Sequence, residues 1–217
     1  MRLWRDTHEH DEGTQRIGAF SDGVYAIAIT LLVIEIGVPA VSSEESLGTA
    51  LRDLWPGYFA YILSFVTIGI SWANHHSFFK MFTRSDHHFL MLNVLFLMCI
   101  AFLPFPTAVL GEYLDNDSQR QTAVVFYTAG RLAPATAWLT VWAYGNWHGL
   151  VDEDLHPNYT RLLTLQYSAT VGLYVLAVAL AFWQPYAALA IIVGITGLYF
   201  LPPRPRRYIS GEMEDLI

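Results

Sequence analysis

Apolar residues fall along this chain in long runs separated by short polar segments. A helix rises ~1.5 Å per residue, so about 20 apolar residues cross a hydrocarbon layer ~30 Å thick. Backbone groups in lipid must be hydrogen-bonded within their own segment, which favours helices. The pattern predicts an all-α membrane protein with six transmembrane helices in one domain, residues 16–201. The predicted spans are 17–38, 54–78, 89–110, 122–144, 162–183 and 185–201.

Composition supports this class. Hydrophobic residues make up 54% of the 217 residues and charged residues 14%, whereas soluble domains are about 25% charged. A soluble domain of this size could not cover its surface with so few charges. The single cysteine, Cys99, lies in the third predicted span, which excludes an intrachain disulfide.

The segments outside the spans are predicted to be tails and loops. Residues 1–15 are polar and are predicted to form a flexible cytoplasmic N-terminus without a fixed metal site. Residues 202–217 form a tail that is first basic and then acidic. The outer loop 39–53 is expected to contain a short helix capped by Ser42 or Ser43. Pro104 and Pro106 are expected to kink the third span.

Lysine and arginine residues predict the orientation, because cytoplasmic loops carry an excess of them. Six spans place both termini on one side. Only Arg52 and Arg120 fall on the other side, and Arg131 lies inside the fourth span. Both termini are therefore predicted to be cytoplasmic. The basic residues on that side are Arg2, Arg5, Arg16, Lys80, Arg84, Arg161, Arg204, Arg206 and Arg207.

The first span begins with an unusual acidic residue, Asp22. An ionised side chain inside a membrane costs at least ~2.5–3.5 kcal/mol unless it is paired or hydrated. Asp22 should therefore have a partner, either Arg16 or a polar residue at the inner end of the second span. The candidates in that span are Asn74, His75 and His76.

One face of the first span carries no charge over most of its length. At 100° per residue, Asp22 and Glu35 turn away from this face. If it lines a pore, the pore is narrow and mainly apolar. The alternative is that it packs against helices of its own subunit, and spacing alone favours that alternative. The face contains Arg16, Phe20, Gly23, Ile27, Thr30, Leu31 and Ile34.

Several motifs resemble one family. The segment Arg16-x-x-x-Phe20-Ser21-Asp22 resembles the signature of the prokaryotic TMEM175-like potassium channels. The resemblance covers roughly the first half of the chain. It continues through 23–33 and recurs as Ser71-Trp72-Ala73-Asn74-His75-His76, Asn93-Val94-Leu95-Phe96-Leu97 and Phe102-Leu103-Pro104-Phe105-Pro106-Thr107.

The resemblance implies a six-helix subunit that assembles as a homotetramer, with the first helix lining the pore and no re-entrant pore loop. It implies a leak-type potassium channel in the inner membrane of a bacterial or archaeal cell, needing no cofactor besides the permeant ion. Ile27 is the expected constriction, with Thr30 and Ile34 next outward, and Glu35 is placed at the outer mouth. The expected structural network at the inner end contains Arg16, Phe20, Ser21, Asp22, Asn74, His75 and His76.

Other functions receive less support. No catalytic motif occurs, and Ser21 and Asp22 point 100° apart on a helix, so they cannot build a relay with a histidine. A proton- or cation-coupled secondary transporter is the alternative, because Asp22 and the histidines could relay protons. Transporters usually have broken helices, whereas the first span is unbroken. Arg131 lies either on the ion path or in an interhelical pair. No nucleic-acid partner is predicted.

Overall fold

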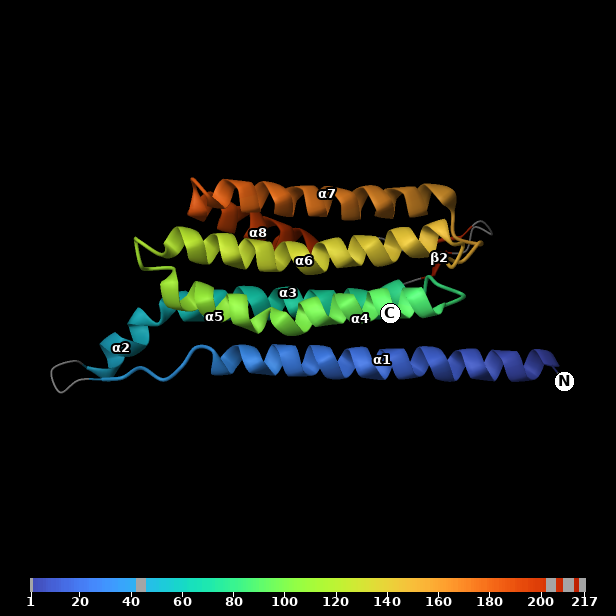
Figure 1. Ribbon diagram of the computed structural model, residues 1–217, viewed down its shortest axis with the longest axis horizontal. Helices are drawn as coiled ribbons and strands as arrows, with labels where there is room; N and C mark the ends of the chain where they lie inside the picture. The colour runs from blue at the N-terminus through green and yellow to red at the C-terminus, as the bar shows by residue number, and fades with distance from the viewer. Residues whose placement is uncertain (1, 42–45, 202–205, 209–212, 215–217) are drawn as a thin grey trace.

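The computed structural model describes residues 2–41, 46–201, 206–208 and 213–214 (Figure 1). Helices dominate the described chain, and two short strands pair antiparallel in the C-terminal tail, with Arg206 opposite Glu214. Within the described residues, this pair and two isolated bridges, Phe82 with Val151 and Leu155 with Tyr208, depart from the all-α prediction. The elements are α1 (Arg2–Ile34), α2 (Leu47–Asp53), α3 (Trp55–Phe79), α4 (His87–Phe102), α5 (Pro104–Tyr113), α6 (Arg120–Trp147), α7 (Pro157–Ala181), α8 (Pro185–Phe200), β1 (Arg206–Arg207) and β2 (Met213–Glu214).

Four segments are long and apolar enough to cross a membrane, and α8 is a shorter apolar helix. The predicted multi-pass membrane protein is therefore confirmed, whereas the count of six spans stays a prediction. α6 is not among the four, although it has 28 residues. It packs against α4, α5, α7 and α8, and a helix covered by other helices needs no apolar surface toward lipid. The four segments are Ile17–Ile34, Trp55–Phe79, His87–Tyr113 and Pro157–Ala181.

Three boundaries differ from the sequence prediction or refine it. α1 begins at Arg2 rather than near residue 16, because hydropathy marks where a helix enters lipid and not where it starts. The flexibility predicted for residues 1–15 stays a prediction. The third span divides at Leu103 into α4 and α5, as its prolines predicted. The cap of α2 is Ser46, while the predicted caps lie among residues 42–45, outside the described residues.

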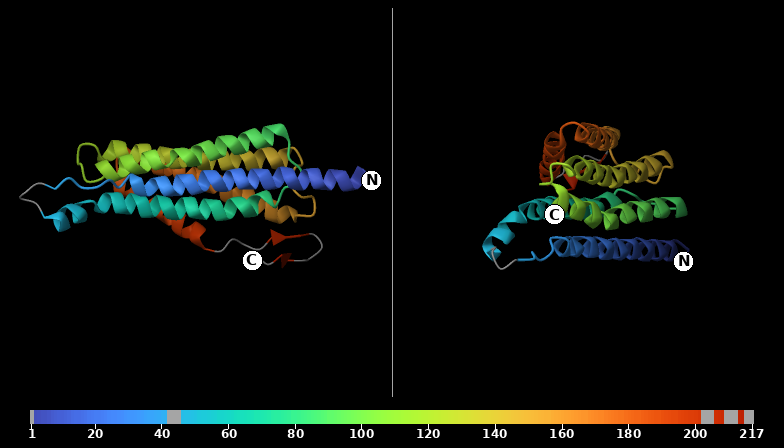
Figure 2. Two further views of the ribbon diagram at one scale, coloured as in Figure 1. Left: turned by 90° about the horizontal axis from the view of Figure 1, so that it is seen from below. Right: turned by 60° about the vertical axis from the view of Figure 1, so that its left-hand side comes forward.

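The long helices lie side by side in layers, with α1 as an outer layer (Figures 1 and 2). α1 packs against α3, α4 and α5. The start of α1, the α3–α4 turn and the α6–α7 loop meet at one end of the bundle, at the right of Figure 1. Helices therefore alternate in direction, as the predicted topology requires.

The helices approach one another closely where side chains are small. A Cβ added to Gly130 of α6 would lie 2.9 Å from Cγ of Pro106 in α5, so only glycine allows this contact. Small residues at such crossings let membrane helices pack by van der Waals contact. At the end of the bundle where α1 begins, the Thr83 N–H donates to the Leu150 carbonyl over 3.1 Å. This bond joins the α3–α4 turn to the α6–α7 loop.

Asp86 caps the N-terminus of α4. Its Oδ1 accepts a hydrogen bond from the Phe89 N–H over 2.8 Å, and its Oδ2 accepts one from the Tyr144 hydroxyl over 2.8 Å. The pKa of Asp86 lies below its usual value of 3.8, chiefly because its carboxylate accepts the Phe89 N–H. Burial opposes this shift, whereas the Tyr144 hydroxyl and the nearby His88 and His148 add to it. These contacts favour the ionised carboxylate.

This cap predicts an acid-sensitive contribution to stability. The contribution is fully present above the unfolded pKa of Asp86 and is lost as pH falls through the lower folded pKa. Asp86→Asn, which retains a capping oxygen, should therefore flatten the fall in melting temperature of the purified protein between about pH 5 and about pH 3. Asp154→Asn, at an exposed acid, is the control and should leave the fall unchanged. Equal acid profiles for wild type and Asp86→Asn would refute this role.

Candidate functional site

The first helix has one covered and one uncovered face. Tyr25 and Leu32 are 1% and 0% exposed, and they face the rest of the chain. On the opposite side Phe20, Ile27 and Ile34 are 56%, 62% and 69% exposed. The interpretation that the uncharged face packs within its own subunit is therefore wrong. This face is left free by the described chain.

Thr30 lies on the uncovered face and is itself exposed. Its hydroxyl donates toward the carbonyls of Ala26 and Ile27, over 2.9 and 3.0 Å. The proton is thereby directed into the helix backbone, and the oxygen lone pairs remain available as acceptors. The face thus offers oxygen between two large aliphatic side chains, Ile27 and Ile34. Glu35 follows directly after the helix and is exposed.

Asp22 has a partner that the sequence analysis did not name. Its Oδ1 accepts a hydrogen bond from Nε1 of Trp72 on α3, over 2.8 Å. Trp72 is neither charged nor an amide or imidazole, the side-chain types expected to pair with Asp22. An indole N–H inside a membrane also needs an acceptor, and this requirement was the missed signal.

The two adjacent histidines of α3 have different surroundings. His75 is 5% exposed, and its Nε2 pairs with Oδ1 of Asn93 over 3.0 Å. His76 is exposed. The structure therefore pairs His75 with Asn93 of α4, while the side chain that hydrogen-bonds Asp22 is Trp72.

A second bond fastens α1 to α3. The hydroxyl of Tyr25 and Oγ of Ser71 are 2.8 Å apart, and the Tyr25 ring meets His75 edge-on with centroids 5.6 Å apart. Tyr25 and Ser71 fall within the segments that carry the family resemblance, but no role was predicted for them. Together with the Asp22–Trp72 bond, this contact fixes the rotation of α1 about its own axis.

Other members of the predicted network lie elsewhere. Phe20 is exposed on the free face of α1, and Asn74 lines a cavity on another side of α3. Neither belongs with Asp22, because helix rotation separates them from it. Ser21 is 1% exposed, and its Oγ has no hydrogen-bond partner among the described residues. The side chain of Arg16 lies outside the described residues, so its role stays a prediction.

Similarity to known proteins agrees with this arrangement. The family described as "Endosomal/lysosomal potassium channel TMEM175" matches residues 16–104. The chain is 40% identical over 190 residues to a potassium channel of Chamaesiphon minutus, covering 86% of this chain and 93% of the relative. The chain belongs to the TMEM175 family. It is also 39% identical over 190 residues to a potassium channel of Streptomyces collinus, covering 85% of this chain and 90% of that protein.

A solved structure of the family has the same fold. The crystal structure of a lysosomal potassium-selective channel TMEM175 homologue from Chamaesiphon minutus superposes with a TM-score of 0.78 at 38% identity. The match covers 88% of this chain and 97% of that one. The second half of the chain, where sequence motifs are few, therefore shares the family fold as well.

Proposed function

We infer that this protein is a potassium channel and that α1 lines its conduction path. The TMEM175 relatives that cover most of both chains are potassium channels, and the solved homologue is described as potassium-selective. These relatives are ion channels and not enzymes. The position of the conduction path is our proposal, and the observation that supports it is the uncovered face of α1.

A single chain leaves one apolar face of α1 exposed. α1 is an outer layer of the bundle (Figure 2), yet its free face is uncharged between Asp22 and Glu35. A single outer helix cannot enclose an ion path, so several copies must surround one. We propose a homotetramer in the inner membrane, with both termini cytoplasmic and four α1 helices around the central axis. The number four rests on the resemblance to the family.

The side chains of this face suggest how ions pass. Ile27 would form the narrowest ring, and hydrophobic rings control conduction by excluding or admitting water. Thr30 would present hydroxyl oxygens next to it, and Ile34 would form a wider apolar ring. Glu35 would attract cations at the outer mouth. A partly dehydrating path of this kind favours potassium, which holds its water less tightly than sodium does.

Flux through liposomes tests the function. Purified protein should dissipate an outward potassium gradient faster than a sodium gradient, without ATP or a second solute. The control is empty liposomes prepared from the same lipid. A folded, oligomeric preparation with no flux above this control would contradict a channel. Flux that needs a coupled proton or cation gradient would instead support a secondary transporter.

A further inference from the structure

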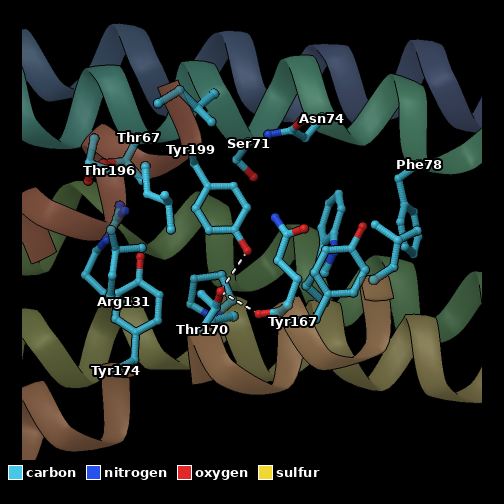
Figure 3. A pocket seen from close by; sticks show the side chains of 18 of the residues that line it. Thr67, Ser71, Asn74, Phe78, Arg131, Tyr167, Thr170, Tyr174, Thr196 and Tyr199 are labelled. Atoms are coloured by element: carbon cyan, nitrogen blue, oxygen red, sulfur yellow. Dashed lines mark hydrogen bonds between the residues drawn. The ribbon is translucent and has the colours of Figure 1, made fainter. Parts of the chain in front are cut away.

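A partly open cavity of about 660 Å³ lies on the side of α3 away from α1 (Figure 3). It lies between α3, α4, α6, α7 and α8, away from the free face of α1. α8 has 16 residues, whereas α7 has 25, and α8 is inclined to the other helices in the left view of Figure 2. α8 therefore does not fill all the space between α3 and α7. The volume is within the ~300–1,000 Å³ usual for small-molecule sites.

A buried cation lies at one end of this cavity. Arg131 is 3% exposed, and Figure 3 shows it between Tyr174 and Thr196. Tyr174 is a hydrogen-bond partner of the guanidinium, but the Arg131 Nε has none. No aspartate or glutamate lines the cavity in the described part of the chain. Of the two interhelical partners expected for Arg131, a carboxylate or helix-end carbonyls, no carboxylate lines this cavity within the described residues.

Several other polar groups of the wall are already hydrogen-bonded, either within the wall or to α1. The hydroxyls of Thr170 and Tyr199 are 2.7 Å apart, those of Thr67 and Thr196 are 3.1 Å apart, and Ser71 bonds Tyr25 of α1. A cavity built to hold water would present unbonded groups along its length. Here the unmatched donor and the unmatched positive charge coincide at Arg131. The remaining wall is mainly apolar and includes Ile68, Ile100, Leu162, Leu163, Ile195 and Leu198.

We propose that this cavity binds an amphiphile with one carboxylate head and an apolar tail. The carboxylate pairs with the Arg131 guanidinium at the end of the cavity, and the tail lies along the apolar wall toward the end of α8. A single negative charge balances the single positive one. A phosphate monoester carries about −1.5 to −2 charges at pH 7 and would leave a net charge in the membrane interior, which is costly. A phosphodiester lipid carries the same single charge but has two tails, so we assign the cavity to a monocarboxylate with one tail, such as a free fatty acid.

Trp138 provides a probe, since it lines the same cavity. A dibrominated fatty acid, whose bromines quench tryptophan emission on contact, is titrated into the full-length protein in nanodiscs. The signal of Trp138 is the difference between wild type and Trp138→Phe. The acid should quench this signal saturably, and its methyl ester, which lacks the charge, should not. Equal, non-saturating quenching by acid and ester would mean partition into lipid only and would overturn the proposal.

Variants of the cation test the head group. Arg131→Met should weaken the apparent affinity for the acid at least about tenfold, as expected for losing a hydrogen-bonded charge, and Arg131→Lys should restore part of it. Arg161→Met removes an exposed arginine outside the cavity and should bind as wild type does. Unchanged affinity in a folded Arg131→Met protein would overturn the proposal. So would protection of Trp138 by phosphatidylglycerol at lower concentration than by unbrominated fatty acid, because that outcome assigns the cavity to a phospholipid.

Discussion

Replacing Ile27 by asparagine should raise potassium flux and weaken the preference for potassium over sodium. Ile27 is 62% exposed on the free face of α1, and its side chain is the proposed narrowest ring. An amide of similar size lets water and ions remain hydrogen-bonded through the ring, which lowers the barrier from dewetting. A barrier lowered by about 1.4 kcal/mol gives a tenfold rate, so we expect flux to rise by about tenfold. Liposome flux and single-channel recording measure both quantities.

A matched substitution on another helix separates this effect from general damage. Ile62 of α3 is 58% exposed and lies outside the proposed path. Ile62→Asn should therefore leave selectivity unchanged, although it places the same amide on the surface. Should Ile27→Asn conduct and select as wild type does, in an oligomer of normal size, the constriction lies elsewhere. Should both variants change selectivity alike, the effect is not specific to the pore.

The positions of the helices can be predicted from the sequence, because every segment that crosses lipid must be long and mainly apolar. Hydropathy finds α3, α7 and α8 to within a few residues, and Pro104 explains the division of the third span. It fails at the start of α1, because residues before the membrane continue the same helix without being apolar. It also reports α6 weakly, since Arg131 and other polar groups are covered by neighbouring helices.

The two faces of α1 could not be told apart from periodicity. Both are apolar, so Tyr25 and Leu32 on one side and Ile27 and Ile34 on the other fit packing equally well. Which face is covered depends on contacts with α3 and α4, which are distant in sequence. The family signature lies on α1 but does not distinguish its faces. Only the fold shows which of its faces the chain leaves uncovered.

The need of Asp22 for a partner was predictable, but the identity of that partner was not. A charged side chain in a membrane segment needs a partner, and α3 offers several candidate donors between Trp72 and His76. Trp72 precedes Asn74 by two residues, so the two point to different sides of the helix. A rotation of α3 by half a turn would have exchanged them. The sequence does not determine that rotation, because α3 carries polar groups on both sides.

Removing the acceptor at Asp22 should destabilise the protein and impair its assembly. Asp22→Ala leaves the Trp72 N–H without an acceptor where α1 crosses α3, and a hydrogen bond to a charged group contributes about 1.5–3 kcal/mol. Asp22→Asn keeps an acceptor oxygen and should therefore lose less stability than Asp22→Ala. The melting temperature in detergent and the elution volume of the oligomer measure the two effects. Ion flux should fall with the amount of intact oligomer.

A double-mutant cycle with Trp72→Phe assigns the effect to this bond. If the loss of stability comes from this bond, the double variant Asp22→Ala, Trp72→Phe should be little less stable than either single variant. Additive losses would mean that Asp22 acts through other groups. Trp55 and Asp115 form a matched control pair with a 2.9 Å bond of the same type, which does not involve α1. Trp55→Phe should leave assembly intact, because its bond joins the start of α3 to Asp115 and does not fasten α1.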